Sequence, residues 1–230
     1  MVKHSPKRSS LKKGRPPANS RNRKKRCLIV SGGEVTEAQY FECLKAHYPN
    51  FVLCTKPQVG SPDQVAAYAL TLLANSNSLS DEDKYEAVFV VVDVDDYLVE
   101  QFKKAQRECR SRKAMLAISN PCFETWLIYY RQPCPDSFST TKACEDKARA
   151  LDLVGGPRNK ALSVTFLRDI TRDLPSAVVN AEHHDTNERR LKRNRLDSLG
   201  FAPWTDMPVL IKELDRLNQA GFSPVVRGSS

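Results

Sequence analysis

Three aspartates follow the most apolar segment of the chain. The run Ala87–Val92 is rich in β-branched residues, which is typical of a strand buried on both faces. Asp93, Asp95 and Asp96 come after it. Because side chains alternate along a strand, we expect Asp93 and Asp95 on the same side. Acids are also favoured near the start of a helix, so the alternative is that they only end the strand and cap the next helix.

An earlier apolar strand leads into glycines and glutamates. Leu28–Val30 is followed by Gly32 and Gly33, and Glu34 and Glu37 come next. Glycines at such a turn produce either a tight bend or a close approach to a ligand. In a parallel sheet, ligands bind beyond the carboxyl ends of the strands, so both acidic segments are expected at the same edge.

Carboxylates gathered at one edge predict an all-oxygen metal site. Mg²⁺ and Mn²⁺ prefer such ligands. Cleavage of a phosphodiester needs charge stabilisation on the phosphate and a deprotonated water, and one or two bound cations supply both. These residue types therefore indicate cation-assisted phosphodiester hydrolysis.

The hydrophobic pattern predicts an α/β domain that would position these residues. Four apolar strands alternate with helices, an order typical of a mainly parallel sheet flanked by helices. Thr36, Ser61 and Asn120 are expected N-caps, and Ser61 with Gln64 forms the pattern of a capping box. The expected strands are 28–30, 51–55, 85–96 and 114–119, and the expected helices are 36–48, 61–74, 98–112 and one opened by Asn120 and Pro121.

Beyond Arg131 the composition changes, and helices without strands are expected. A Pro- and Ser-rich connection is followed by apolar patterns of helical period and by a long polar segment. The expected helices are 142–153, 158–174, 176–199 and 206–217. The predicted organisation is a disordered basic arm at 1–25, an α/β core at 26–132, a helical C-terminal extension at 133–215 and a tail at 216–230.

The net charge of +9 belongs to the first part of the chain. Of the 36 Lys and Arg residues, 11 lie within residues 1–26, which contain no acid, so that 25 remain against 27 acids elsewhere. Lys12, Lys13 and Arg15 belong to KKGRPP, which has the Gly-Arg-Pro core of an AT-hook for the minor groove of DNA. A polybasic arm that neutralises phosphates of DNA or RNA is the alternative. Both predict salt-sensitive binding of nucleic acid.

A second basic cluster lies in the long polar segment. Arg189, Lys192 and Arg193 lie close together on the expected helix, where they could follow a phosphate backbone. A solvated helix surface is the alternative.

Other classes of protein are not supported by the sequence. The seven cysteines form no Cys-x-x-Cys pair and, with the four histidines, no zinc spacing. No charge-free apolar run approaches the roughly 18 residues of a membrane span, and no apolar stretch follows the basic N-terminus. We therefore expect a soluble, cytoplasmic protein without a membrane partner.

Four segments together resemble the RloB-like family. LIVSGGEVTEAQYF, VFVVVDVDD, AISNPCFETWLIYY and APWTDMPVLIKEL occur in the order and at about the spacing seen in that family, between about residues 28 and 214. The family belongs to the Toprim-like superfamily, whose domains hold Mg²⁺ with a Glu after the first strand and an Asp-x-Asp after a later one. RloB-like proteins occur near restriction-modification and phage-defence genes, often beside an ATPase of the ABC or AAA type, and are suspected nucleases.

The resemblance implies particular site residues and one departure. Asp93 and Asp95 match the Asp-x-Asp motif, and Glu37 matches the Glu of the family's Thr-Glu pair. The position of the usual Toprim Glu is occupied by Gly32. Glu34, in the loop between, is therefore a candidate to replace it.

Two more residues are candidates outside these motifs. Glu124 lies in SNPCFETW, where the apolar side chains are explained by packing, and it is either a further metal ligand or a structural residue. Lys160 follows a flexible Gly-Gly and resembles the charge-stabilising lysine of OLD-type nucleases.

Two functions of different classes follow. The first is a Mg²⁺- or Mn²⁺-dependent Toprim-type nuclease of an anti-phage defence system, kept in check by a partner ATPase. The second is a non-catalytic module of the same fold that binds nucleic acid or a partner, because Gly32 replaces the usual Glu. Nucleotidyl transfer ranks last, since no Gly-rich phosphate loop with its lysine is present. The sequence leaves open whether the substrate is DNA or RNA, any sequence specificity, the activating signal and the oligomeric state.

Overall fold

The computed structural model describes residues 24–81, 83–133, 140–156, 160–184, 199 and 202–220. Most of the predicted arm and tail, and all of 185–198, lie outside the described residues. The nucleic-acid-binding residues predicted there therefore lie outside them too: Lys12, Lys13, Arg15, Arg189, Lys192 and Arg193.

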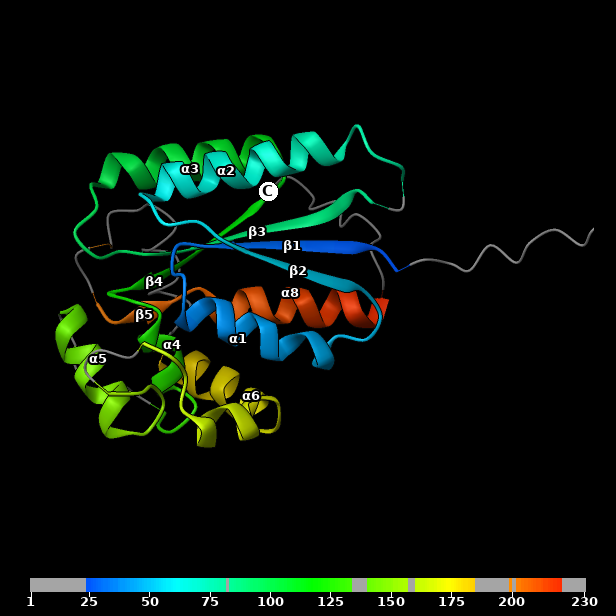
Figure 1. Cartoon of the computed structure of the whole chain (residues 1–230). Coiled ribbons are helices and arrows are strands. Elements are labelled where there is room, and N and C mark those ends of the chain that lie inside the picture. The colour runs from blue at the N-terminus through cyan, green and yellow to red at the C-terminus, as the bar shows by residue number, and fades with distance from the viewer. Residues whose placement is uncertain are drawn as a thin grey trace, which may run out of the picture.

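A five-stranded sheet forms the centre of the fold (Figure 1). Its order is β2-β1-β3-β4-β5, with the first four strands parallel and β5 antiparallel to β4. The predicted mainly parallel α/β fold is confirmed. The short β5 is an addition, because two residues are too few to show a pattern. The strands are β1 (Arg26–Ser31), β2 (Val52–Pro57), β3 (Tyr85–Asp93), β4 (Met115–Asn120) and β5 (Trp204–Thr205).

Helices cover both faces of the sheet (Figure 1). On one face, α2 (Pro62–Ser76) and α3 (Val99–Ser111) lie side by side. On the other face lie α1 (Thr36–Leu44), followed by a 3₁₀ turn at Lys45–His47, and α8 (Met207–Ala220). Three further helices lie on the same side as α1 and α8: α4 (Glu124–Ile128), α5 (Thr141–Ala150) and α6 (Val164–His184).

Side-chain alternation along the strands divides the core in two. In β1, Cys27 and Ile29 pack in the cluster with α1, α4, α6 and α8, whereas Leu28 and Val30 pack in the cluster with α2 and α3. The apolar run of β3 contributes to both clusters in the same alternating way. Both faces are therefore buried, which explains why the central strands are apolar without interruption.

The start of α2 follows the predicted capping box in part. The side-chain oxygen of Gln64 accepts a hydrogen bond from the Ser61 backbone N–H at 2.9 Å. The Ser61 hydroxyl donates to the Asp63 carboxylate at 2.6 Å.

The predicted N-cap of α1 is wrong. Thr36 is the first residue of the helix, and Val35 occupies the N-cap position. The buried Thr36 hydroxyl donates instead to the carbonyl oxygen of Lys160 at 2.7 Å. A contact with a residue far along the chain therefore replaces the local cap.

The predicted N-cap of α4 is also wrong. Asn120 is the last residue of β4, where it pairs with Trp204 of β5, and α4 begins only at Glu124. The Asn120 side-chain amide donates to the carbonyl oxygen of Leu199 at 2.7 Å. Pairing with β5 lengthens the strand beyond the predicted boundary.

One helix replaces two predicted ones. The sequence suggests separate helices on either side of Pro175, whereas α6 continues through this residue to His184. The buried stripe of α6 has helical spacing across the proline, and this burial offsets the lost backbone hydrogen bond. The stripe comprises Phe166, Ile170, Leu174, Ala177 and Ala181. None of the described helices is long and apolar enough to cross a membrane.

Candidate functional site

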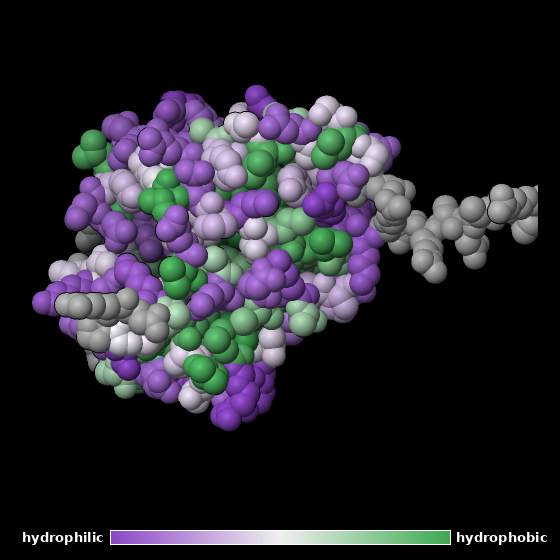
Figure 2. All heavy atoms as spheres, in the orientation of Figure 1, coloured by the Kyte–Doolittle hydropathy of each residue, from purple (hydrophilic) through white to green (hydrophobic). Residues whose placement is uncertain are grey.

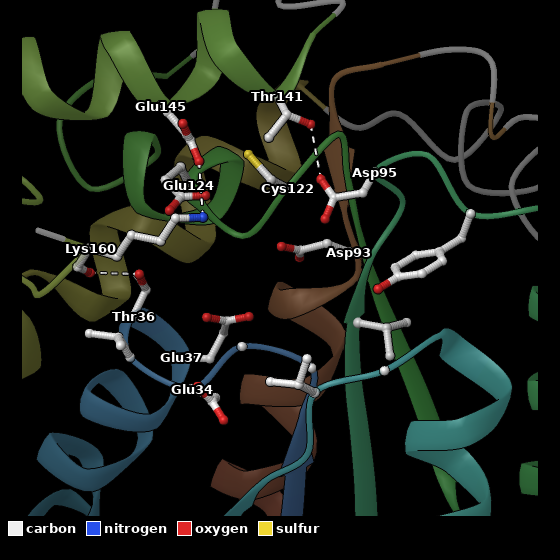
Figure 3. A pocket seen from close by; sticks show the side chains of 17 residues that line it. Glu34, Thr36, Glu37, Asp93, Asp95, Cys122, Glu124, Thr141, Glu145 and Lys160 are labelled. Atoms are coloured by element: carbon white, nitrogen blue, oxygen red, sulfur yellow. Dashed lines mark hydrogen bonds and ion pairs between the residues drawn. The ribbon is translucent and has the colours of Figure 1, made fainter. Parts of the chain in front are cut away.

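A pocket of about 340 Å³ opens at the carboxyl ends of β1 and β3 (Figure 3). Its walls come from the loops after the four parallel strands, from α5 and from the segment that follows α5. All the residues that the sequence proposes for catalysis or metal binding line it: Glu34, Glu37, Asp93, Asp95, Glu124 and Lys160. The lining also includes three polar residues that the sequence analysis missed: Cys122, Thr141 and Glu145.

Glu37 lies in the first turn of α1 and is only 5 % exposed. Its carboxylate lies directly against Gly33, because a Cβ atom at Gly33 would lie 2.0 Å from Glu37 Oε2. A Cβ at Gly32 would meet the Val91 carbonyl oxygen at 3.7 Å, an ordinary contact. Only the second glycine is therefore required for the approach of the carboxylate.

Asp93 ends β3 and points into the space between the other carboxylates (Figure 3). Its Oδ1 atom is buried and has no hydrogen-bond partner among the described residues. Buried carboxylate oxygens are normally paired, and an unpaired one is suited to a cation.

Asp95 reaches the pocket through a turn. The residue lies beyond the end of β3 with φ of 38°, in the left-handed region that few non-glycine residues adopt. The Thr141 hydroxyl donates to Asp95 Oδ1 at 3.0 Å. Asp93 and Asp95 line the same pocket, as the sequence predicts. The reason differs, because Asp95 lies in a turn beyond the strand and is not placed there by the alternation of side chains along β3.

Lys160 enters from the segment after α5. Its ammonium group lies 3.2 Å from Glu145 Oε1, and its side chain is 71 % exposed. Burial lowers the pKa of Lys160, but the Glu145 carboxylate and other acids outweigh this, so that the net shift is upward. Thr141 and Glu145 are four residues apart on α5, and this helical spacing was the available signal for the missed residues.

Four of the pocket carboxyls hold their protons more strongly than usual, because their pKa values are raised. Burial raises the pKa of Glu37 to about 7, and the nearby Glu124 adds to the shift while Lys160 opposes it. Burial, and then the charge of Glu37, raises the pKa of Asp93 well above its ordinary value. Burial is also the main cause of the raised pKa of Glu124 and of Asp95. Each shift reports that negative charge here is poorly compensated.

Glu34 differs from Glu37 in its position. It is exposed at the rim, and its side chain points away from the other carboxylates (Figure 3). Of the two glutamates, Glu37 is the one whose charge acts on Asp93.

The carboxylates do not form a complete metal cage. In the part of the chain that the structure describes, no group of three or more His, Cys, Asp or Glu side chains is arranged to hold a metal ion. Mg²⁺, however, is usually held by one or two carboxylates together with water and substrate phosphates. The oxygen donors and the unpaired Asp93 Oδ1 fit a cation of this kind.

The fold and the pocket define an α/β protein with an acidic site at the carboxyl edge of a mainly parallel sheet. The family model described as RloB-like protein matches residues 27–214, a range that contains every residue lining the pocket. The chain therefore belongs to the RloB-like family. No curated protein and no solved structure gave a match.

Proposed function

We propose that this protein is a Mg²⁺- or Mn²⁺-dependent nuclease. The observation that carries the proposal is the excess of negative charge in the pocket, where six acidic side chains accompany one lysine among the described lining residues. Such an excess is unfavourable unless protons or cations compensate it. Titratable groups with shifted pKa values gather at functional sites more often than elsewhere.

Asp93 and Glu37 are the proposed holders of the cation. Asp93 lies at the end of β3, and Glu37 lies in the first turn of α1, which follows the adjacent strand β1. Both line the pocket, and Asp93 contributes the Oδ1 atom that has no partner among the described residues. Asp95, oriented by Thr141, and Glu124 complete the oxygen donors. When bound, the cation would stabilise negative charge on the scissile phosphate and lower the pKa of a water molecule.

Lys160 is assigned to the phosphate. Its exposed ammonium group is held at the pocket by Glu145, and the Thr36 hydroxyl holds the backbone of the same residue. The positive charge of Lys160, held at this position, would stabilise negative charge that develops on the phosphate oxygens.

A non-catalytic binding module is the second candidate. Two observations favour it: Gly32 stands where the Toprim pattern has its glutamate, and the described carboxylates form no three-residue metal cluster. Such a module would bind nucleic acid or a partner without a cation in the pocket.

Cation binding separates the two candidates. Calorimetry with Mg²⁺ or Mn²⁺ would be combined with cleavage assays on plasmid DNA, single-stranded DNA and tRNA. Wild type, Asp93→Asn and Asp95→Asn would be compared with Asp96→Asn, because Asp96 is adjacent and exposed but does not line the pocket. The nuclease proposal expects binding and cleavage that are lost only in the pocket variants. Absence of cation binding in the wild type would favour the binding module.

The cellular role is also proposed from the family resemblance. Membership of the RloB-like family supports a place in an anti-phage defence system, with an ABC- or AAA-type ATPase as partner and the cytoplasm as location. Cleavage assays with and without an added ABC- or AAA-type ATPase would test whether cleavage depends on such a partner.

A further inference from the structure

Three exposed apolar residues surround the mouth of the acidic pocket. Val35 is 40 % exposed, Val59 is 59 % exposed and Tyr97 is 38 % exposed. All three line the pocket. They follow β1, β2 and β3 respectively, which are neighbours in the sheet, so that the three loops meet at the same edge.

Exposed apolar side chains are common on protein surfaces, and these three differ from the others in lying at the acidic pocket. On the face shown in Figure 2, apolar residues form several separate groups among hydrophilic ones. Val35, Val59 and Tyr97 instead share a pocket with the carboxylates. The pocket therefore combines an acidic part, suited to a cation and a phosphate, with an apolar and aromatic rim.

A ligand that matches both parts must carry an anionic group beside a flat apolar one. A nucleotide has this character, since its phosphate binds cations while the faces of its base stack on aromatic rings. In a duplex each base is stacked between its neighbours, so its faces are not available to a protein side chain. A volume of about 340 Å³ lies at the lower end of the range for small-ligand pockets, which suits one nucleotide unit.

We infer that Tyr97, supported by Val35 and Val59, is a stacking platform for an unpaired base of single-stranded nucleic acid whose phosphate lies at the carboxylates. This inference rests on the proposed function and names the substrate class of the same site. Tyr97 is a specificity residue in this scheme: its ring selects unpaired nucleotides, and it takes no part in bond cleavage.

The neighbouring residue provides a matched control. Leu98 is 70 % exposed and apolar, but it does not line the pocket. Its role at the start of α3 uses the backbone N–H, which donates to Gln101 Oε1 at 2.9 Å, so truncation of its side chain preserves this contact. Tyr97→Phe keeps the ring and removes the hydroxyl, whereas Tyr97→Ala removes both.

The test is fluorescence anisotropy with the full chain, using Ca²⁺ in place of Mg²⁺ to suppress cleavage, at a salt concentration that weakens phosphate-only binding. The probes are a labelled single strand, a duplex of equal length and an abasic single strand. Tyr97→Ala should bind the single strand about 5- to 150-fold more weakly than wild type. Its affinities for the duplex and the abasic strand should be unchanged, and Tyr97→Phe and Leu98→Ala should resemble wild type.

Several results would overturn the platform. Equal weakening on all three probes, no weakening on the single strand, or a Tyr97→Phe defect as large as that of Tyr97→Ala would each do so. Cleavage by the wild type is measured separately with Mg²⁺. Tyr97-dependent binding by a wild type that neither binds Mg²⁺ nor cleaves would refute the nuclease and support the platform. Cleavage without Tyr97-dependent binding would support the nuclease and refute the platform.

Discussion

Acidic side chains are paired with basic ones at the amino ends of β1 and β3, whereas acidic side chains lie beside one another at the carboxyl ends. At the amino end, the Lys25 ammonium lies 2.7 Å from Glu86 Oε1, and Arg26 Nη1 lies 3.2 Å from Asp83 Oδ1. Arg26 also lies over the ring of Tyr85. Each of these acids has a basic partner, and the side chains are at least partly exposed to solvent.

At the carboxyl end, acids face other acids. Glu37 and Glu124 are buried beside Asp93, whose Oδ1 is unpaired among the described residues. This arrangement lowers the free energy of unfolding, because burial of like charges is costly. The difference between the two ends supports the proposal that the carboxyl end binds a charged ligand.

The largest effect is expected when Asp93, the acid at the centre of the pocket, is replaced. Asp93→Asn should lower cation-dependent cleavage by about 100-fold or more, as the loss of an electrostatic catalytic group does. It should not lower the free energy of unfolding, because Asp93 Oδ1 makes no hydrogen bond among the described residues that the substitution would break. Cleavage kinetics and urea denaturation would measure both effects.

Asp96→Asn is the control for this variant and should change neither quantity. A loss of both stability and activity in Asp93→Asn would contradict the comparison, since it would mean that Asp93 stabilises the folded chain.

A second prediction concerns the two glycines. Gly33→Ala should weaken cation binding with little change in stability, because its Cβ would lie 2.0 Å from Glu37 Oε2 and the flexible end of that side chain would have to move away. Gly32→Ala is the matched variant and should retain both stability and cation affinity, since its Cβ makes only ordinary contacts. Thermal unfolding and calorimetry would compare the two. Equal behaviour of the variants would refute the placement of Glu37 against Gly33.

The stability of the cation-free protein should fall as the pH rises. The folded-state pKa of Glu37 is about 7 against an ordinary value of 4.5, so its protonated form contributes stability below pH 4.5 that is lost as the pH approaches 7. Mg²⁺ should restore stability more at about pH 8 than at about pH 6, because binding requires the deprotonated carboxylates. Urea denaturation across this window, with and without Mg²⁺, would measure the effect. Glu37→Gln should flatten the dependence, and an unchanged slope would exclude Glu37 as its source.

The smallest effect is expected at the amino end. Glu86→Gln removes the partner of Lys25, and both side chains are substantially exposed. Such pairs contribute roughly 0–1 kcal/mol, so stability should decline slightly while cation binding and cleavage remain as in wild type. Denaturation at low and high salt would check this. A change in cleavage would show that the two ends are not independent.

Much of the fold was predictable because strand and helix patterns are local. The apolar run of β3 and the Ser61 to Gln64 pattern of α2 each correspond to the predicted kind of element. The errors occurred where distant residues intervene. Thr36 bonds to Lys160 and Asn120 pairs with β5, so neither acts as a cap.

The sequence by itself determined which acids follow which strands, and hence that Asp93 and Glu37 belong at the carboxyl edge of the sheet. Only the tertiary structure decided that Glu37 faces Asp93 while Glu34 points outward, and that α5 supplies Thr141 and Glu145 to the same pocket. The physical reason is that the positions of strands and helices along the chain follow from local periodicity, whereas the direction of a loop side chain depends on contacts between residues far apart in the chain.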